Sequence, residues 1–431
     1  MITISKLNAV IFVVMFCFFV FASKALSFLG IKITGIEYIV WFAIVSLLAV
    51  INFRYLSNEI LVKRTYFLLL IILLSFCIAN YFVSDAHIIP YLQGTFFTFL
   101  FAVNFILFYN IKIEKKSYYF MANSVIFILS AIIVVAYLER IFVEREYDSF
   151  YLRGIQTVTK DTGLACTLFN MNIILCLGMF IQKRKKRYLY IAMISFITIT
   201  LLLYLKAIAA SLVIIVVFAL VFFDKRIRKI MLSVLSILLF ALLIILGKPF
   251  LNQVKYKQNL YFGKGAEATP RIALYIAGIQ MAKDYFPFGS GQGTFGSYPV
   301  GKKYSPIYYK YKLNNVYGLG PNAVKSTTEN FLFDTYWSHI IGEMGFIASF
   351  FYLWLWFFPV LKTWKYMGAI QSETKAFSFI ITLCIITIFI ESFALSIPEQ
   401  LPFIMLYAGL GAITYKLLFT SINTEEGTIR L

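Results

Sequence analysis

Ionisable side chains gather in the segment TTENFLFDTYWSHIIGEMGF, residues 327–346, where a polar stretch leads into an apolar helix. Glu329 and Asp334 are carboxylates that could take a proton from a hydroxyl group, and His339 could act as an acid or a base. On a helix, His339 and Glu343 would be four residues apart and close enough to pair. The residue types leave two structural alternatives open, an N-cap role for Asp334 and a buried, hydrogen-bonded His339.

Arginine is used sparingly in the neighbouring polar segments. Arg271 is the only arginine in residues 248–334, which otherwise use lysine, and it opens the amphipathic pattern RIALYIAGIQMAKDYFPFG. Arg140 and Arg153 lie in another polar segment, residues 139–161. A guanidinium group is a planar fork that donates two parallel hydrogen bonds to a phosphate, and lysine cannot replace it there. These arginines therefore predict a phosphate site, with snorkelling to lipid headgroups as the alternative for Arg271.

Two further patterns could contribute to such a site. The stretch GSGQGTFGS, residues 289–297, lacks the Lys-Ser/Thr and the strand–helix context of a nucleotide loop, so we interpret it as a flexible turn. Nearby side chains could contact sugars, although an aromatic belt at the membrane surface explains the tyrosines equally well. These candidates are Lys283, Tyr298, Tyr304, Tyr336 and His339. Metal-ligand spacing is absent, so we expect neither a metal ion nor another cofactor.

The elements that must position these residues are apolar. Of the 431 residues, 61% are hydrophobic and 14% are charged, and the mean hydropathy is +0.83. Soluble domains average about 45–50% apolar and about 25% charged residues. We therefore predict an all-α polytopic membrane protein whose first helix is retained and not cleaved. About 12 transmembrane helices are expected, near residues 8–29, 35–52, 65–83, 89–111, 117–138, 162–181, 188–205, 208–223, 230–247, 335–361, 376–395 and 399–419.

The loops between these spans alternate in charge. Lys and Arg cluster after the even-numbered spans, whereas the loops SDAHIIP and LSIPEQ contain neither. The positive-inside rule then places both termini in the cytoplasm. It divides the chain into spans one to nine (1–247, with the external segment 139–161), one large external loop (248–334), and the last three spans with a cytoplasmic tail (335–431). Because topology explains much of the net charge of +19, nucleic acid is not expected as a partner.

Ionisable residues within the spans are few. Lys206 and Glu391 are the main examples, and no chain of buried acids is evident. Carriers usually line their path with such groups. The sequence therefore favours chemistry at the external face over transport.

Four stretches of the chain form a recognisable pattern. One is the helix opened by Arg271, and the next is DYFPFGSGQGTF, residues 284–295, in which a glycine-rich turn follows a proline. The third is DTYWSHIIGEMGFIAS, residues 334–349, with a Glu-x-Gly sequence inside an apolar helix. LRGIQTVTKDTGLACTLFN, residues 152–170, adds Arg153 before a polar helix start. Together these stretches resemble the Wzy-type O-antigen polymerases and the related O-antigen ligases.

The resemblance implies a membrane glycosyltransferase that joins undecaprenyl-pyrophosphate-linked oligosaccharides at the external face of the bacterial inner membrane. The growing chain would leave its lipid carrier and join the non-reducing end of a new repeat unit, without a metal ion. Arg153 and Arg271 would bind the leaving pyrophosphate, and Asp334, with Glu329 as second choice, would activate the acceptor hydroxyl.

Related ligases carry a histidine where this chain has Asp334-Thr335, which favours a polymerase. An O-antigen ligase, or a flippase for lipid-linked sugars, stays open as an alternative. Besides membrane lipid and the lipid-linked oligosaccharide, the resemblance implies a flippase and a chain-length regulator as partners.

Overall fold

The computed structural model describes residues 3–28, 36–52, 64–84, 87–142, 162–223, 226, 233, 270–326, 330–369, 371–394 and 396–429. These residues form helices and connecting segments with no strand among them, which confirms the all-α prediction. The long helices are α1 (Ile4–Phe28), α2 (Ile36–Ile51), α4 (Arg64–Val83), α5 (Ile88–Asn110), α6 (Lys115–Phe142), α7 (Thr162–Lys183), α8 (Arg187–Leu201), α9 (Leu205–Phe222), α14 (Tyr336–Thr363), α15 (Ser372–Glu391) and α17 (Gly411–Ile429).

Length and hydropathy agree with a multi-pass membrane protein. Among the described residues, 8 helices are long and apolar enough to cross a membrane, and α2, α4 and α8 supply shorter apolar segments. A helix lies at every expected span except 230–247, which falls outside the described residues apart from residue 233. The total of about twelve spans therefore stays a prediction.

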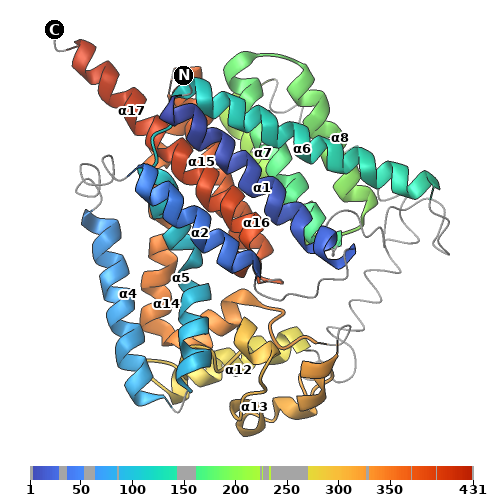
Figure 1. Ribbon diagram of the computed structural model, residues 1–431, viewed down its shortest axis with the longest axis vertical. Helices are drawn as coiled ribbons and strands as arrows, with labels where there is room; N and C mark the ends of the chain where they lie inside the picture. Colours follow the sequence, from blue (N-terminus) through green and yellow to red (C-terminus); the bar gives the residue numbers. More distant parts are fainter. Residues whose placement is uncertain are drawn as a thin grey trace.

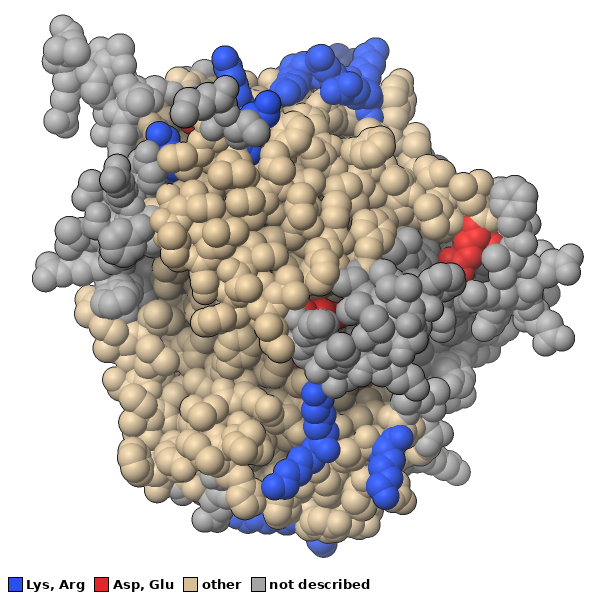
Figure 2. Space-filling view, viewed as in Figure 1, with Lys and Arg blue, Asp and Glu red and all other residues tan. Residues whose placement is uncertain are grey.

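The bundle is held together by contacts between helices, some consecutive and some distant in sequence. α7 packs against α6, α8, α9 and α15, and α15 also packs against α14 and α17. Between α5 and α14, the rings of Phe101 and Trp356 stack with their centroids 4.0 Å apart, and both are buried. Figure 2 shows a broad band of uncharged side chains with Lys and Arg above and below it, the pattern expected of a bilayer-spanning surface.

The predicted large external loop contains a small folded unit where the structure describes it. α12 (Pro270–Asp284) runs across one end of the bundle, and α13 (Ile307–Lys310) lies beside it (Figure 1). Three short 3₁₀ helices complete the unit: η3 (Tyr298–Gly301), η4 (Leu313–Asn315) and η5 (Pro321–Lys325). Its separate apolar core includes Leu274, Met281, Phe295, Tyr308, Leu319 and Leu332. We call this end of the bundle the α12 end. The first turn of α1 and the last turn of α17 lie at the opposite end (Figure 1).

Two membrane helices depart from regular α-helical geometry. α14 is interrupted at Gly345, whose φ is 73° and ψ is 174°. The last span consists of α16 (Leu401–Ile404), a π-helical turn (Met405–Leu410) and α17. Non-helical backbone within a membrane is tolerated only where protein groups satisfy its hydrogen bonds. The groups that bond to the α14 break therefore identify the segment that this part of the bundle holds in place.

Candidate active site

The clearest chemical feature of the α12 end is an ion pair between two predicted site residues. Arg271 Nε donates to Asp334 Oδ2 at 2.6 Å, and Arg271 Nη2 lies 2.5 Å from the same oxygen. The side chains are 27% and 16% exposed, so solvent or a ligand can reach the pair. Pro270 at the first position of α12 suits a helix start, because proline lacks the N–H that would stay unpaired there. The helix thereby presents Arg271 from its first turn.

Asp334 is fixed by the segment in front of α14 and not by the helix itself. The N-cap residue is Thr335, with extended backbone, so the alternative in which Asp334 caps the helix is wrong. The Asp334 amide donates to Phe331 O at 3.3 Å within a turn. Ser396 Oγ donates to Phe333 O at 2.7 Å and ties this turn to the segment after α15. Asp334 thus sits at a junction of three elements.

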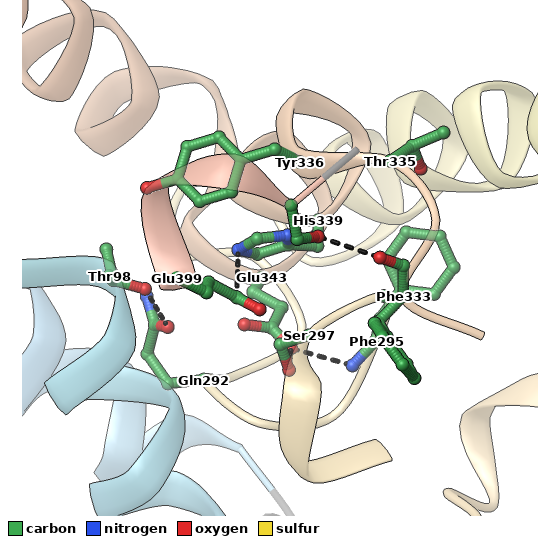
Figure 3. A network of polar contacts seen from close by, with 12 residues as sticks. Thr98, Gln292, Phe295, Ser297, Phe333, Thr335, Tyr336, His339, Glu343 and Glu399 are labelled. Atoms are coloured by element: carbon green, nitrogen blue, oxygen red, sulfur yellow. Dashed lines mark hydrogen bonds and ion pairs between the residues drawn. The ribbon is translucent and has the colours of Figure 1, made fainter. Parts of the chain in front are cut away.

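Five residues after Asp334 in the chain, α14 contributes His339 to a buried acid–base pair. His339 Nε2 is 3.5 Å from Glu399 Oε1, and these side chains are 0% and 4% exposed (Figure 3). Burial, and secondarily the nearby carboxyl of Glu343, raises the pKa of Glu399 well above its usual value. The suggested pairing of His339 with Glu343 is therefore wrong, because the imidazole faces Glu399 in the loop after α15.

Tyr336, one of the predicted sugar contacts, belongs to the same buried layer. Its ring packs edge-on against His339 with centroids 4.7 Å apart, and its hydroxyl lies 2.5 Å from that of Tyr352. Tyr336 and His339 are both fully buried. These buried contacts favour a role in supporting the structure of the site over direct contact with a sugar.

Glu343 fastens the glycine-rich stretch 289–297 to the break in α14. Its Oε1 accepts from the Phe295 amide at 2.8 Å and from Ser297 Oγ at 2.7 Å (Figure 3). The amide of Ser290 donates to Gly342 O at 2.9 Å, and that of Gly291 donates to Glu343 O at 3.2 Å. The interpretation of this stretch as a flexible turn is wrong, because hydrogen bonds near both of its ends hold it against α14.

Side chains from α4 and α5 also hold the glycine-rich stretch. Together with Glu343 of α14 they form what we call its socket. Asn80 Nδ2 donates to Glu343 O at 3.1 Å and also contacts the carbonyls of Phe288 and Gly289. Thr98 Oγ1 donates to Gln292 Oε1 at 3.0 Å (Figure 3). Gly293, at φ 74°, lies so close to α5 that a side chain would meet the Pro90 carbonyl. Position 293 therefore demands glycine.

The other predicted sugar-binding residues spread over the folded unit. Tyr298 is half-buried, 5.1 Å from the ring of Phe97, with Lys302 Nζ 4.7 Å from its centroid. The Tyr304 hydroxyl donates to Leu319 O at 2.8 Å, and burial raises its pKa to about 12. Lys283 is exposed near the end of α12 opposite Arg271.

Several predicted residues cannot be placed. Arg153 and Glu329 lie outside the described residues, and Arg140 is in α6 but its side chain is not described.

Glu391 is one of the few ionisable residues predicted within the spans. Its carboxylate accepts from Asn170 Nδ2 at 2.7 Å and from Thr167 Oγ1. Glu399 was not predicted as a site residue, although an acid in the short loop LSIPEQ was the available signal.

Comparison with known proteins agrees with the motifs. Residues 190–353 match a protein-family model described as O-antigen ligase. The match covers less than half of the chain but includes Arg271, the glycine-rich stretch, Asp334 and Glu343. Comparison with curated protein sequences gives no significant match. The family match confirms the resemblance to the O-antigen polymerases and ligases, and supports a membrane enzyme that acts on lipid-linked sugars.

Proposed function

We propose that this protein polymerises lipid-pyrophosphate-linked oligosaccharide repeats, because the segment that carries the ion pair matches the family model described as O-antigen ligase. The observation that supports this proposal most directly is the contact between Arg271 and Asp334. It brings a phosphate-binding group and a proton acceptor together at one partly exposed position. These are the two groups that glycosyl transfer from a pyrophosphate needs.

In the proposed reaction, the donor pyrophosphate takes the place of Asp334 on the guanidinium fork. The bond between the anomeric carbon and the pyrophosphate oxygen breaks, and its electron pair leaves with the pyrophosphate. Negative charge grows on that oxygen, so a fixed cation stabilises the transition state more than the ground state. Arg153 is proposed as a second cation.

The released carboxylate of Asp334 then serves the acceptor. It takes the proton of the hydroxyl at the non-reducing end of the next repeat, while that oxygen forms the new bond to the anomeric carbon. Glu329 stays the second proposal for this role. The chain grows by one repeat, and a lipid pyrophosphate is left.

A cavity lined mostly by apolar side chains, with Glu37 and Gln400 as polar members, supports binding of the lipid carrier. It has a volume of about 190 Å³ and lies among the ends of α1, α2, α7 and α16. Tyr38 lines the cavity, and its hydroxyl donates to Glu399 O at 3.0 Å. Its apolar lining includes Phe19, Val20, Leu164, Leu168, Leu401 and Phe403. We propose that part of an undecaprenyl tail occupies it, with the α12 end outside the inner membrane.

The proposal of a polymerase and not a ligase rests on the residue before α14. By the resemblance, ligases carry a histidine where this chain has Asp334. His339 offers no replacement in this geometry, because it is fully buried and paired with Glu399. A carboxylate is therefore the group available to the acceptor.

The test is the surface polysaccharide of a strain that lacks this chain. A polymerase predicts lipid A-core carrying a single repeat unit, because repeats are still made, exported and ligated. Bare cores together with lipid-linked polymer would instead identify a ligase. An unchanged ladder of chain lengths would contradict both enzymes and favour a flippase or another role.

A further inference from the structure

A second pocket opens on the folded unit, away from the ion pair. It has a volume of about 250 Å³ and lies between the end of α12, the glycine-rich stretch and α13. This is smaller than the roughly 300–1,000 Å³ of pockets for drug-sized ligands, so it suits one ring and not a whole repeat unit. Its lining residues are Tyr285, Ser290, Thr294, Ser305, Pro306, Ile307 and Lys310.

Hydroxyl groups from three segments face this pocket. Lys310 Nζ donates to the Tyr285 hydroxyl at 2.9 Å and lies 4.3 Å from the centroid of the same ring. The hydroxyls of Ser290 and Thr294 are 2.9 Å apart. Each hydroxyl can both donate and accept a hydrogen bond, and Pro306 and Ile307 add apolar surface. Hydroxyls combined with apolar surface match the two kinds of surface on a sugar ring.

The pocket is distant from the proposed reaction centre. Arg271 opens α12 and Asp284 ends it, and a rise of about 1.5 Å per residue separates them by about 20 Å. Tyr285 follows directly after Asp284. A sugar in this pocket therefore cannot be the one that leaves the pyrophosphate, but it can belong to the same oligosaccharide.

The glycine-rich stretch connects the pocket to the membrane helix. Ser290 lines the pocket through its side chain and donates its amide to Gly342 O in α14. Thr294 lines it one residue before Phe295, whose amide binds Glu343. The position of the pocket relative to the bundle is thus fixed by the α14 break, as a binding subsite requires.

We propose that this pocket binds one saccharide ring of the lipid-linked chain, several sugars away from the bond that reacts. The inference rests on the proposed function for the identity of the chain, and on the pocket for its position. A subsite of this kind holds the polymer without contacting the pyrophosphate. It should therefore control how long the polymer stays bound and not the chemical step.

Binding of a pyrophosphate-free oligosaccharide tests the subsite directly. The probe is the host's own surface oligosaccharide, released from its lipid by mild acid, and the readout is saturation-transfer NMR on the purified protein. We expect Tyr285→Phe combined with Lys310→Met to weaken binding at least tenfold. Lys303→Met, which changes an exposed lysine of the same unit outside the pocket, should bind as the wild type does.

Two outcomes would overturn the subsite: wild-type protein that does not bind the oligosaccharide, or a double variant that binds it unchanged. Thermal unfolding of the double variant near the wild-type temperature shows that its fold is intact. The deletion strain judges the proposed function separately. Normal polymer in that strain, together with pocket-dependent binding, would reject the polymerase and leave the saccharide site standing.

Discussion

Arg271 and Asp334 are 63 residues apart in the chain and form one ion pair, so each substitution tests a different half of the proposed chemistry. Arg271→Lys keeps the charge but loses the planar fork that a pyrophosphate needs. We expect polymer formation to fall roughly 100-fold, the usual cost of removing one transition-state donor. The measurement is the elongation rate with purified lipid-linked repeats. Wild-type rates for Arg271→Lys would exclude bidentate phosphate binding.

Asp334→Asn removes the proton acceptor and keeps the size of the side chain. We expect elongation to be lost while lipid-linked substrate still binds. The matched control is Glu373→Gln, which removes an acid of α15 paired at 3.1 Å with Lys115 of α6. Exposed ion pairs of this kind contribute about 0–1 kcal/mol to stability. The amide oxygen introduced by Asp334→Asn can still accept a hydrogen bond from Arg271, so both variants should fold. Full-length polymer from Asp334→Asn would remove Asp334 from the base role.

Glu399 should make stability depend on pH. Its pKa is raised by burial, so from about pH 4.3, the ordinary value for glutamate, the folded state retains a proton that the unfolded state loses. The free energy of unfolding therefore decreases as pH rises above that value, until the folded group ionises. Glu399→Gln cannot ionise, and we expect its unfolding temperature to fall less than that of the wild type between pH 5 and pH 8. Parallel curves would show that Glu399 is not the source.

At the scale of elements, the break in α14 is the feature on which the site depends. Gly345 has φ 73° and ψ 174°, a region that only glycine adopts readily, and a Cβ there would lie 2.6 Å from Pro287 O. We expect Gly345→Ala to destabilise the protein by about 1–3 kcal/mol and to release the glycine-rich stretch. The measurements are thermal unfolding and protease cleavage of residues 285–297.

Gly368→Ala is the control for Gly345→Ala, because a Cβ at Gly368 meets nothing within 4 Å. It lies at the far end of the same helical segment, where helix α14 passes into a 3₁₀ turn (Trp364–Gly368). We expect it to unfold like the wild type. Equal unfolding temperatures for the two alanine variants would mean that the break tolerates a side chain.

The same element shows how far sequence could predict this site. Span positions follow from length and hydropathy, so α14 was expected at 335–361 and is found at Tyr336–Thr363. Its break depends on Asn80 and on residues 288–295, which lie far away in the chain. The partner of His339 was also unpredictable, because Glu399 belongs to a loop after α15. Contacts between segments that are distant in the chain leave no periodic pattern in the sequence, so they could not be predicted from it.

At the scale of the whole molecule, two ends of different chemistry flank an apolar band (Figure 2). One end holds the basic segment 183–187 between α7 and α8, and the other holds α12, the ion pair and the pocket. The composition predicted the membrane class correctly. It could not predict that residues 270–326 fold into a unit with its own core, because tyrosine and phenylalanine suit that core and a membrane surface equally.

This arrangement predicts which end faces the cytoplasm. Lys185, between α7 and α8, and Lys303, between η3 and α13, are exposed. The α7–α8 connection and α13 lie at opposite ends of the molecule (Figure 1). The four cysteines other than Cys17 are buried. By the positive-inside rule, we expect Lys303→Cys to react with a membrane-impermeant maleimide in intact spheroplasts, and Lys185→Cys to react only after permeabilisation. The unsubstituted protein gives the background from native cysteines. The reverse pattern would turn the α12 end toward the cytoplasm, and polymerisation outside the membrane would then lack a site on this protein.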